Sequence, residues 1–194
     1  MCTELKKYYE SFRKDVQSRL SKKRAKHCFN VADEAVKLAE KYDENEENAY
    51  IAGLLHDIMK EYDKSKMLDY IKSGDFEIEE AELDNSALWH GIASAIYAKK
   101  IGIDNIDILN AIRYHTVARE NMSKLEKIVY LADMVSLDRD YPDVDIMRKL
   151  TYDNLDDAML YALTYTIKKQ AQRQGNIPIT TIKAYNYFIT YRNR

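Results

Sequence analysis

Four histidines and a neighbouring aspartate are the first side chains in this sequence that could bind a metal ion. The histidines are His27, His56, His90 and His115, and His56 is followed directly by Asp57. Neutral imidazole and carboxylate together form a mixed nitrogen and oxygen donor set, which suits Fe, Mn, Co or Zn. These residues therefore predict a candidate site for a divalent metal.

Asp133 is a further candidate ligand because it interrupts an apolar segment that runs from residue 128 to residue 135. A carboxylate in such a segment is expected to be buried, and an unpaired buried charge is costly. A metal ion would compensate the charge, and so would an arginine or several backbone N–H groups. The position of Asp133 leaves these alternatives open.

Each candidate ligand also has an ordinary structural interpretation. A histidine on an apolar helix face commonly bonds to a backbone carbonyl, and a His-Asp pair such as His56-Asp57 occurs by chance in many chains. The combination favours a metal, because two imidazoles and two carboxylates lie on three predicted helices, as a site inside a helical bundle requires. Motifs of P-loop enzymes, serine hydrolases, zinc proteases and ferritin-like di-iron proteins are missing from the sequence.

The hydrophobic pattern that must position these residues is helical. Apolar residues recur every three or four positions from His27 to Tyr42, behind a predicted N-cap at Ser21. Only five Gly and two Pro occur in 194 residues, whereas an all-β protein needs many turn residues. We predict an all-α, single-domain helical bundle. The other predicted helices span about 46–58, 63–73, 92–101, 104–115, 124–135, 155–174 and 180–192, with a loop at 75–88.

Charge and cysteine content limit the partners and the compartment. Thirty basic and 32 acidic residues give a net charge of -2, so a nucleic-acid partner is not expected, whereas a small phosphorylated ligand needs only a few local cations. No apolar run approaches the roughly 20 residues of a membrane span. Cys2 and Cys28 cannot form a disulfide framework, and residues 1–10 lack an apolar signal segment, so a cytoplasmic location is expected.

Several stretches of the sequence resemble a known family. The order His27, His56-Asp57 and Asp133 resembles the HD-domain superfamily of metal-dependent phosphohydrolases. Longer stretches resemble its YqeK-type branch, the symmetrical bis(5'-nucleosyl)-tetraphosphatases of bacteria. These stretches are LLHDIMK at 54–60, WHG at 89–91, NAIRYHT at 110–116, MSKLEKIVYLAD at 122–133 and RDYPDV at 139–144. The resemblance runs from about residue 24 to residue 185.

The resemblance implies a metal site and a nucleotide site. It implies one HD-type helical domain over residues 1–194, with a metal-site core at about 21–137 and C-terminal helices that complete the nucleotide pocket. The metal would be iron, with Mn, Co or Zn as alternatives, held by the residues His27, His56, Asp57 and Asp133. The residues around the nucleotide phosphates would be Arg24, Lys60, His90, His115, Thr116 and Arg139.

The activity implied by the resemblance is hydrolysis of diadenosine tetraphosphate to two ADP, by attack of a metal-activated water on an inner phosphorus. Asp57, His90 and His115 are the expected catalytic residues. His90 and His115 could contact phosphate, donate a proton to the leaving group or hold a second metal ion, and we favour phosphate contact with one ion. The alternatives are another nucleotide substrate at the same site, or a binding module without catalysis. A homodimer is left open.

The chain departs from the family pattern in three loops. Val117 and Ala118 stand where the family usually has a Gly, Ser136 and Leu137 replace a Glu-Pro pair, and Asp143 replaces a Gly after Pro142.

Tyrosine is frequent in the sequence, with 16 residues. Five of these lie near the C-terminus: Tyr161, Tyr165, Tyr185, Tyr187 and Tyr191. Their rings combine apolar area with a polar tip, so we expect them to cover a core edge or a dimer surface in preference to stacking on an adenine.

Overall fold

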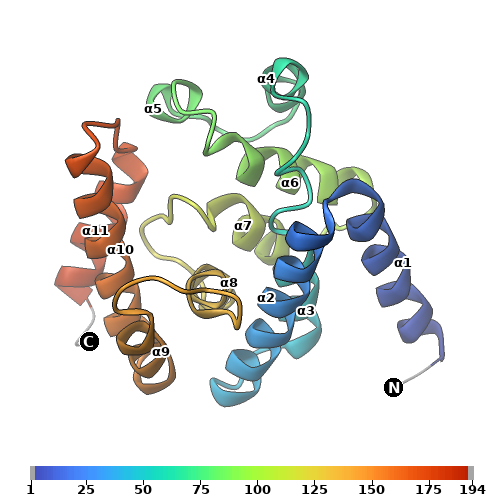
Figure 1. Ribbon diagram of the computed structural model, residues 1–194, viewed down its shortest axis with the longest axis horizontal. Helices are drawn as coiled ribbons and strands as arrows, with labels where there is room; N and C mark the ends of the chain where they lie inside the picture. Colours follow the sequence, from blue (N-terminus) through green and yellow to red (C-terminus); the bar gives the residue numbers. More distant parts are fainter. Residues whose placement is uncertain (1–2, 192–194) are drawn as a thin grey trace.

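Helix follows helix along the whole described chain, residues 3–191 of this computed structural model (Figure 1). The predicted all-α fold is confirmed, since these residues form no strand. The helices are α1 (Thr3–Arg19), α2 (Lys22–Lys41), α3 (Glu46–Leu55), α4 (Lys64–Lys72), α5 (Glu80–Leu83), α6 (Trp89–Lys100), α7 (Ile106–Tyr114), α8 (Lys124–Val135), α9 (Val144–Asp153), α10 (Leu155–Gln172) and α11 (Ile179–Tyr191).

Side-chain caps begin most of these helices. The hydroxyl of Ser21 accepts a hydrogen bond from the backbone N–H of Arg24, so the predicted N-cap of α2 is confirmed. Such a cap satisfies one of the N–H groups that the first turn of a helix leaves unpaired. The same kind of cap is formed ahead of α3, α4, α7, α8 and α10 by Asn45, Asp63, Asn105, Ser123 and Asn154.

The structure adds helices that the hydrophobic pattern did not predict. Helices α1 and α9 lie in segments for which no helix was predicted, and α5 lies inside the predicted loop at 75–88. Helix α5 has only four residues and begins with a reciprocal capping box between Glu79 and Glu82. The carboxylate of Glu82 also pairs with Arg113 of α7. A helix this short depends on tertiary contacts, which sequence periodicity does not record.

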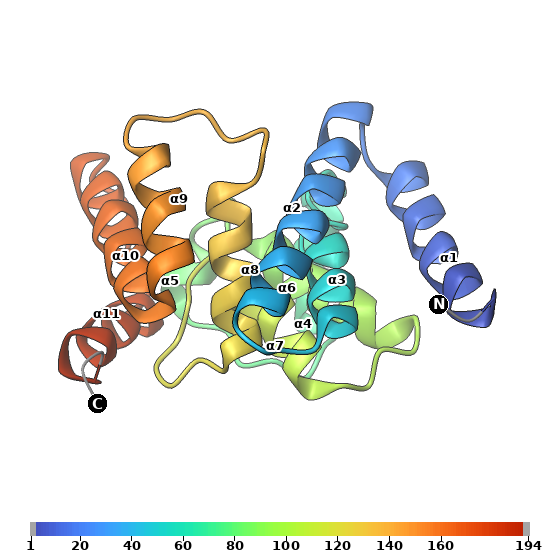
Figure 2. The ribbon, with the colours of Figure 1, turned by 90° about the horizontal axis from the view of Figure 1, so that it is seen from below.

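Helix α8 lies at the centre of the bundle. It packs against α2, α3 and α7 on one side and against α9 and α10 on the other. Figure 2 shows α8 standing between α2 and α9. The N-terminal and C-terminal ends of the described chain lie at opposite ends of the long axis (Figure 1). The central helix therefore connects the metal-ligand helices to the C-terminal helices.

Helices α2 and α3 approach each other closely at Gly53. A β-carbon at this position would lie 2.9 Å from the Cα atom of the buried Ala32 on α2. Only glycine permits this spacing without a backbone shift. The close approach brings His27 on α2 beside His56, the residue that follows α3.

Candidate metal centre

The four predicted ligands come from three helices and converge, together with His115, on one buried point. His27 lies on α2, His56 and Asp57 follow the last residue of α3, Asp133 lies in the last turn of α8, and His115 follows α7. The ring centroids of His27 and His56 lie 5.4 Å apart, and those of His56 and His115 lie 4.9 Å apart. The fold thus places side chains that are far apart in sequence within one cluster.

Backbone carbonyls fix the orientation of two of these imidazoles. The Nδ1 atom of His56 lies 2.7 Å from the carbonyl oxygen of Gly53, and Nδ1 of His115 lies 2.7 Å from that of Ile112. A carbonyl only accepts, so Nδ1 carries the proton in each ring and donates it. In the neutral imidazole the lone pair is then on Nε2, which faces the cluster. The carbonyl-bonded histidine and the metal ligand are therefore compatible interpretations of His56.

Asp138 orients His27 in the same way, and the sequence did not single it out. Nδ1 of His27 lies 2.8 Å from Oδ2 of Asp138, whose other oxygen accepts from Nδ2 of Asn30 at 2.9 Å and from the hydroxyl of Ser136 at 3.1 Å. Partial burial opposes ionisation, but the bonds from Asn30 and His27 lower the pKa of Asp138 to about 2. The contact joins residues 111 positions apart, so no local pattern could have revealed it.

Whether a metal fits the centre can be tested on the hydrogen bonding of the ligand atoms that face one another. Nε2 of His56 and Oδ1 of Asp57 are buried and accept no hydrogen bond from the described residues. Nε2 of His56 lies 3.6 Å from Oδ2 of Asp57 and 3.7 Å from Oδ1 of Asp133, and Nε2 of His27 lies 2.9 Å from that Oδ1. Buried acceptors left this way are costly, and a cation would satisfy them together. The donor set fits a divalent metal.

Three of the predicted ligands, His56, Asp57 and Asp133, are in the protonation state that a metal requires. Burial lowers the pKa of His56 to about 3, so its imidazole is neutral at pH 7. Burial alone would raise the pKa of both aspartates, but His56 holds the pKa of Asp57 well below its usual value, and Arg139 does the same for Asp133. Neutral imidazoles and ionised carboxylates are the forms that coordinate metals.

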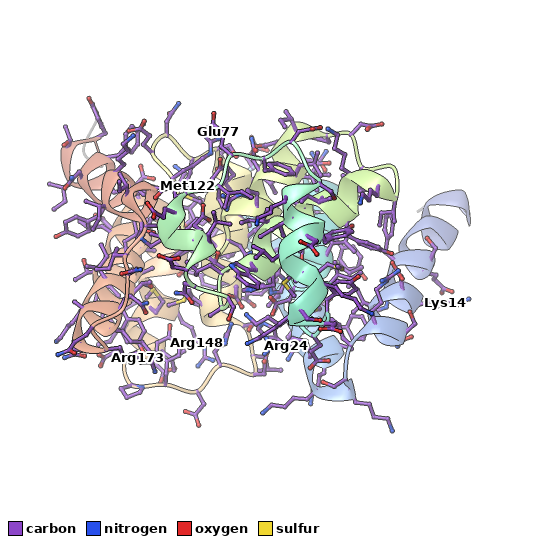
Figure 3. The ribbon with its side chains drawn as sticks, turned by 90° about the horizontal axis from the view of Figure 1, so that it is seen from above. Lys14, Arg24, Glu77, Met122, Arg148 and Arg173 are labelled. Carbon is purple, nitrogen blue, oxygen red and sulfur yellow. The ribbon has the colours of Figure 1, made fainter. Side chains whose placement is uncertain are left out.

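Two arginines contact the ligand carboxylates from the solvent side. Nη1 of Arg24 donates to Oδ2 of Asp57 at 2.8 Å. Arg139 pairs with the carboxylate of Asp133 and donates from Nε to its backbone carbonyl at 2.6 Å. The arginine partner considered for Asp133 is therefore present in addition to the ligand cluster. Figure 3 shows Arg24 at the start of α2, on the same edge of the molecule as Arg148.

A second group of predicted residues lies on the α6 side of the centre. Nε2 of His90 lies 3.0 Å from Oδ1 of Asp57, without hydrogen-bond geometry, and 3.1 Å from Nε2 of His115. Because Nε2 of His115 is an acceptor, the proton between the two rings is on Nε2 of His90. The other ring nitrogen of His90, Nδ1, is then the acceptor for Nζ of Lys60 at 3.2 Å. The buried hydroxyl of Thr116 has no partner among the described residues and so is available to a ligand.

The fold and this centre define the class of protein. A family model described as "HD domain" matches residues 24–138, which contain every predicted metal ligand. The chain belongs to the HD-domain family, and this membership together with the histidine and aspartate cluster implies divalent metal binding. No helix in the described range 3–191 is long and apolar enough to cross a membrane.

Named relatives match nearly the whole chain. A Staphylococcus aureus protein named "Bis(5'-nucleosyl)-tetraphosphatase, symmetrical" is 32% identical over 183 residues, which are 92% of this chain and 93% of the relative. A Bacillus subtilis protein of the same name is 30% identical over 176 residues, 90% of this chain and 94% of the relative. These matches confirm the resemblance that the sequence motifs indicated.

A solved structure shows the same fold. It comes from Clostridium acetobutylicum and is described as a predicted HD superfamily hydrolase involved in NAD metabolism. It is 41% identical in sequence, with a TM-score of 0.90, and the match covers 94% of this chain and 97% of that one.

Proposed function

We propose that this protein is a metal-dependent hydrolase that cleaves diadenosine tetraphosphate symmetrically to two ADP. The observation that carries the proposal is the buried cluster of His27, His56, Asp57 and Asp133, whose edge is lined by arginines. Within it, Nε2 of His56 and Oδ1 of Asp57 have no hydrogen-bond donor among the described residues. The two relatives that match about nine-tenths of the chain are named for symmetrical cleavage of this kind of substrate.

The proposed metal ligands are His27, His56, Asp57 and Asp133, and iron is the proposed ion, with Mn, Co or Zn as alternatives. A divalent ion there would supply Lewis acidity, which polarises a phosphate oxygen and makes water more acidic. Asp138 would hold the ring of His27 with Nε2 toward the ion.

The chain's own cations would carry the charge of the substrate. Arg24 and Arg139 present guanidinium groups beside the ligand carboxylates, and Lys60 lies on the opposite side near His90. In the reaction, the oxygen of water bonds to one inner phosphorus, and the bond from that phosphorus to the central bridging oxygen breaks. The bridging oxygen leaves with the second ADP. Since this is a good leaving group, most of the catalysis is positioning and charge stabilisation.

We assign His90 and His115, with Asp57, to the catalytic group, and Thr116 to phosphate contact. His90 holds a proton at Nε2, and burial lowers its pKa to about 4, so the ring is a neutral donor at pH 7. We also propose that the C-terminal helices complete the nucleotide pocket within one domain. The support is a hollow in which Thr116 lies beside Thr166 of α10 and Thr181 of α11.

Product analysis tests the proposal. The purified protein, loaded with iron under reducing conditions, is incubated with diadenosine tetraphosphate, and the products are separated by ion-exchange chromatography. ADP as the only product would support symmetrical cleavage. AMP with ATP would place the attack on an outer phosphorus, and no turnover with metal present would refute the proposed activity. A cytoplasmic location stays a prediction.

A further inference from the structure

A cavity of about 510 Å³ opens beside the metal centre on the side of His27. Its lining comes from the start of α2, from the loop between α8 and α9, and from α10. The residues that matter here are Arg24, His27, Arg139, Tyr141, Tyr165 and Lys169. The cavity therefore extends from a metal ligand to a helix that lies outside the segment matched by the HD-domain model, residues 24–138.

The far wall of this cavity carries two tyrosine rings. The centroids of Tyr141 and Tyr165 lie 5.3 Å apart, with an angle of 36° between the ring planes. The hydroxyl of Tyr141 donates to the carbonyl of Met134 at 3.1 Å, which fixes that ring relative to α8. Nζ of Lys169 lies 5.4 Å from the centroid of Tyr165. Aromatic rings with a nearby cation are the usual means of binding a base and its phosphate.

Charge within the cavity favours an anion. The carboxylate of Glu61 is engaged by the backbone N–H and hydroxyl of Ser21, at 2.6 and 2.8 Å, and Asp138 is engaged by His27. Lys23 and Lys169 line the cavity and form no ion pair with any carboxylate in the described part of the chain. The cavity is lined by four cations, Lys23, Arg24, Arg139 and Lys169, and by three carboxylates, Glu61, Asp138 and Asp140, so its lining has a formal net charge of +1.

A second hollow lies at the other end of the histidine row. The rings of His27, His56 and His115 follow one another at 5.4 and 4.9 Å, and the cavity begins at His27. The second hollow, of about 60 Å³, has Thr116 in its lining, the residue that follows His115. Helix α10 contributes to both spaces, with Tyr165 and Lys169 on the face toward the cavity and Thr166 and Gln170 toward the hollow. The large cavity at His27 and the small hollow at Thr116 therefore lie toward opposite ends of the histidine row.

We infer that Tyr141, Tyr165 and Lys169 form the binding site for one nucleotide half of the substrate, opposite the half that lies near Thr116. The inference rests on the proposed function, because a dinucleotide with a base at each end needs two such sites. The two sites would hold the phosphate chain with its centre at the metal ligands. The tyrosine site would then determine that cleavage is symmetrical.

Replacement of Tyr165 tests the inference. For the metal-loaded protein, we expect isothermal titration to show two bound ADP per chain, and Tyr165→Leu to weaken one of them by about ten- to a hundredfold. Tyr165→Phe keeps the ring and should restore binding. Tyr187→Leu, on α11 outside the cavity lining, is the matched control and should bind as the unchanged chain does.

A second pair of variants, at exposed positions, keeps the inference testable if Tyr165→Leu does not fold. Lys169→Glu changes an exposed residue and should weaken the same ADP by about tenfold, whereas Lys168→Glu, its exposed neighbour outside the cavity lining, should not. Equal ADP binding by the unchanged chain, Tyr165→Leu and Lys169→Glu would overturn the inference. The failure of the proposed function would look different, because the unchanged chain would then fail to hydrolyse diadenosine tetraphosphate whether or not Tyr165 affects ADP binding.

Discussion

Two buried clusters of charged side chains in this molecule differ in how their polar atoms are satisfied. In the ion pair of Arg113 and Glu82, the two side chains are 2% and 1% exposed, and each carboxylate oxygen accepts from the guanidinium at 2.8 Å. In the metal centre His56 and Asp57 are 0% and 3% exposed, but Nε2 of His56 and Oδ1 of Asp57 accept no hydrogen bond from the described residues. In the ion pair, the atom without a hydrogen-bond partner among the described residues is a donor, Nε of Arg113. In the metal centre, the atoms without a partner are acceptors.

This difference indicates different roles. A buried carboxylate whose oxygens are both satisfied by an arginine needs nothing from outside the chain, and removing the arginine alone is costly because it leaves the charge unpaired. Buried acceptors that face one another need a cation or a hydrogen-bond donor from outside the protein. Substitutions in the ion pair should therefore affect folding, and substitutions in the metal centre should affect metal and turnover.

The largest effect is expected for Asp133→Asn. Loss of a charged ligand should remove the metal and, since the metal contributes several kcal/mol of transition-state stabilisation, reduce turnover by about a thousandfold or more. Metal content is measured by elemental analysis and turnover by ADP release. Asp145→Asn, whose side chain is 91% exposed, is the control. Stoichiometric metal in Asp133→Asn would remove Asp133 from the ligand set.

Arg113→Leu should have the largest effect on stability. It leaves the carboxylate of Glu82 buried without its cation, which is expected to lower the free energy of unfolding by about 3–5 kcal/mol. Urea unfolding measures the loss. The double variant Arg113→Leu with Glu82→Leu should recover most of it, because no buried charge remains. A folded Arg113→Leu variant that had lost its metal but kept the stability of the unchanged chain would contradict the division of roles.

Asp138→Ala should affect metal binding more than folding. Without the carboxylate, the ring of His27 loses its orienting partner, and metal affinity is expected to fall by about 10- to 100-fold. A titration against a competing chelator measures the affinity. Asp140→Ala removes an exposed carboxylate two residues away and provides the comparison. If both variants bind metal as tightly as the unchanged chain, the contact between Asp138 and His27 has no role in holding the ion.

The smallest effect is expected in the loop beside the metal centre. Asp143 has a φ of 70° and forms no side-chain cap at the start of α9. Glycine adopts this conformation freely and alanine does not, so Asp143→Gly should be more stable than Asp143→Ala by about 1 kcal/mol. Thermal unfolding of the two variants measures the difference. An equal stability would show that this loop, unlike the ion pair, relaxes at no cost.

Two departures from the family pattern have the same structural explanation. Ala118, in the Val117-Ala118 pair, and Asp143 both adopt left-handed backbone conformations, with φ of 58° and 70°. Glycine adopts this conformation freely, so both positions are ones at which glycine is favoured. The sequence showed the residue types, but only the structure shows the backbone conformation at these positions.

The sequence by itself determined the helical class, the cap at Ser21 and the candidate ligands His27, His56, Asp57 and Asp133. These follow from local properties, namely periodicity, scarce turn residues and the donor types of single side chains, together with motifs shared with the family. Such properties are carried by residues near one another in the chain, so they can be read without the fold.

The tertiary structure alone decided which side chains contact these residues. It placed Asp138 on His27, Arg139 on Asp133, and Tyr141 beside Tyr165. For Tyr165 the expected role at a core edge is replaced by our inference of a nucleotide site, because the ring lines the cavity. These contacts depend on how helices pack, and packing is set by the shapes of many distant side chains at once.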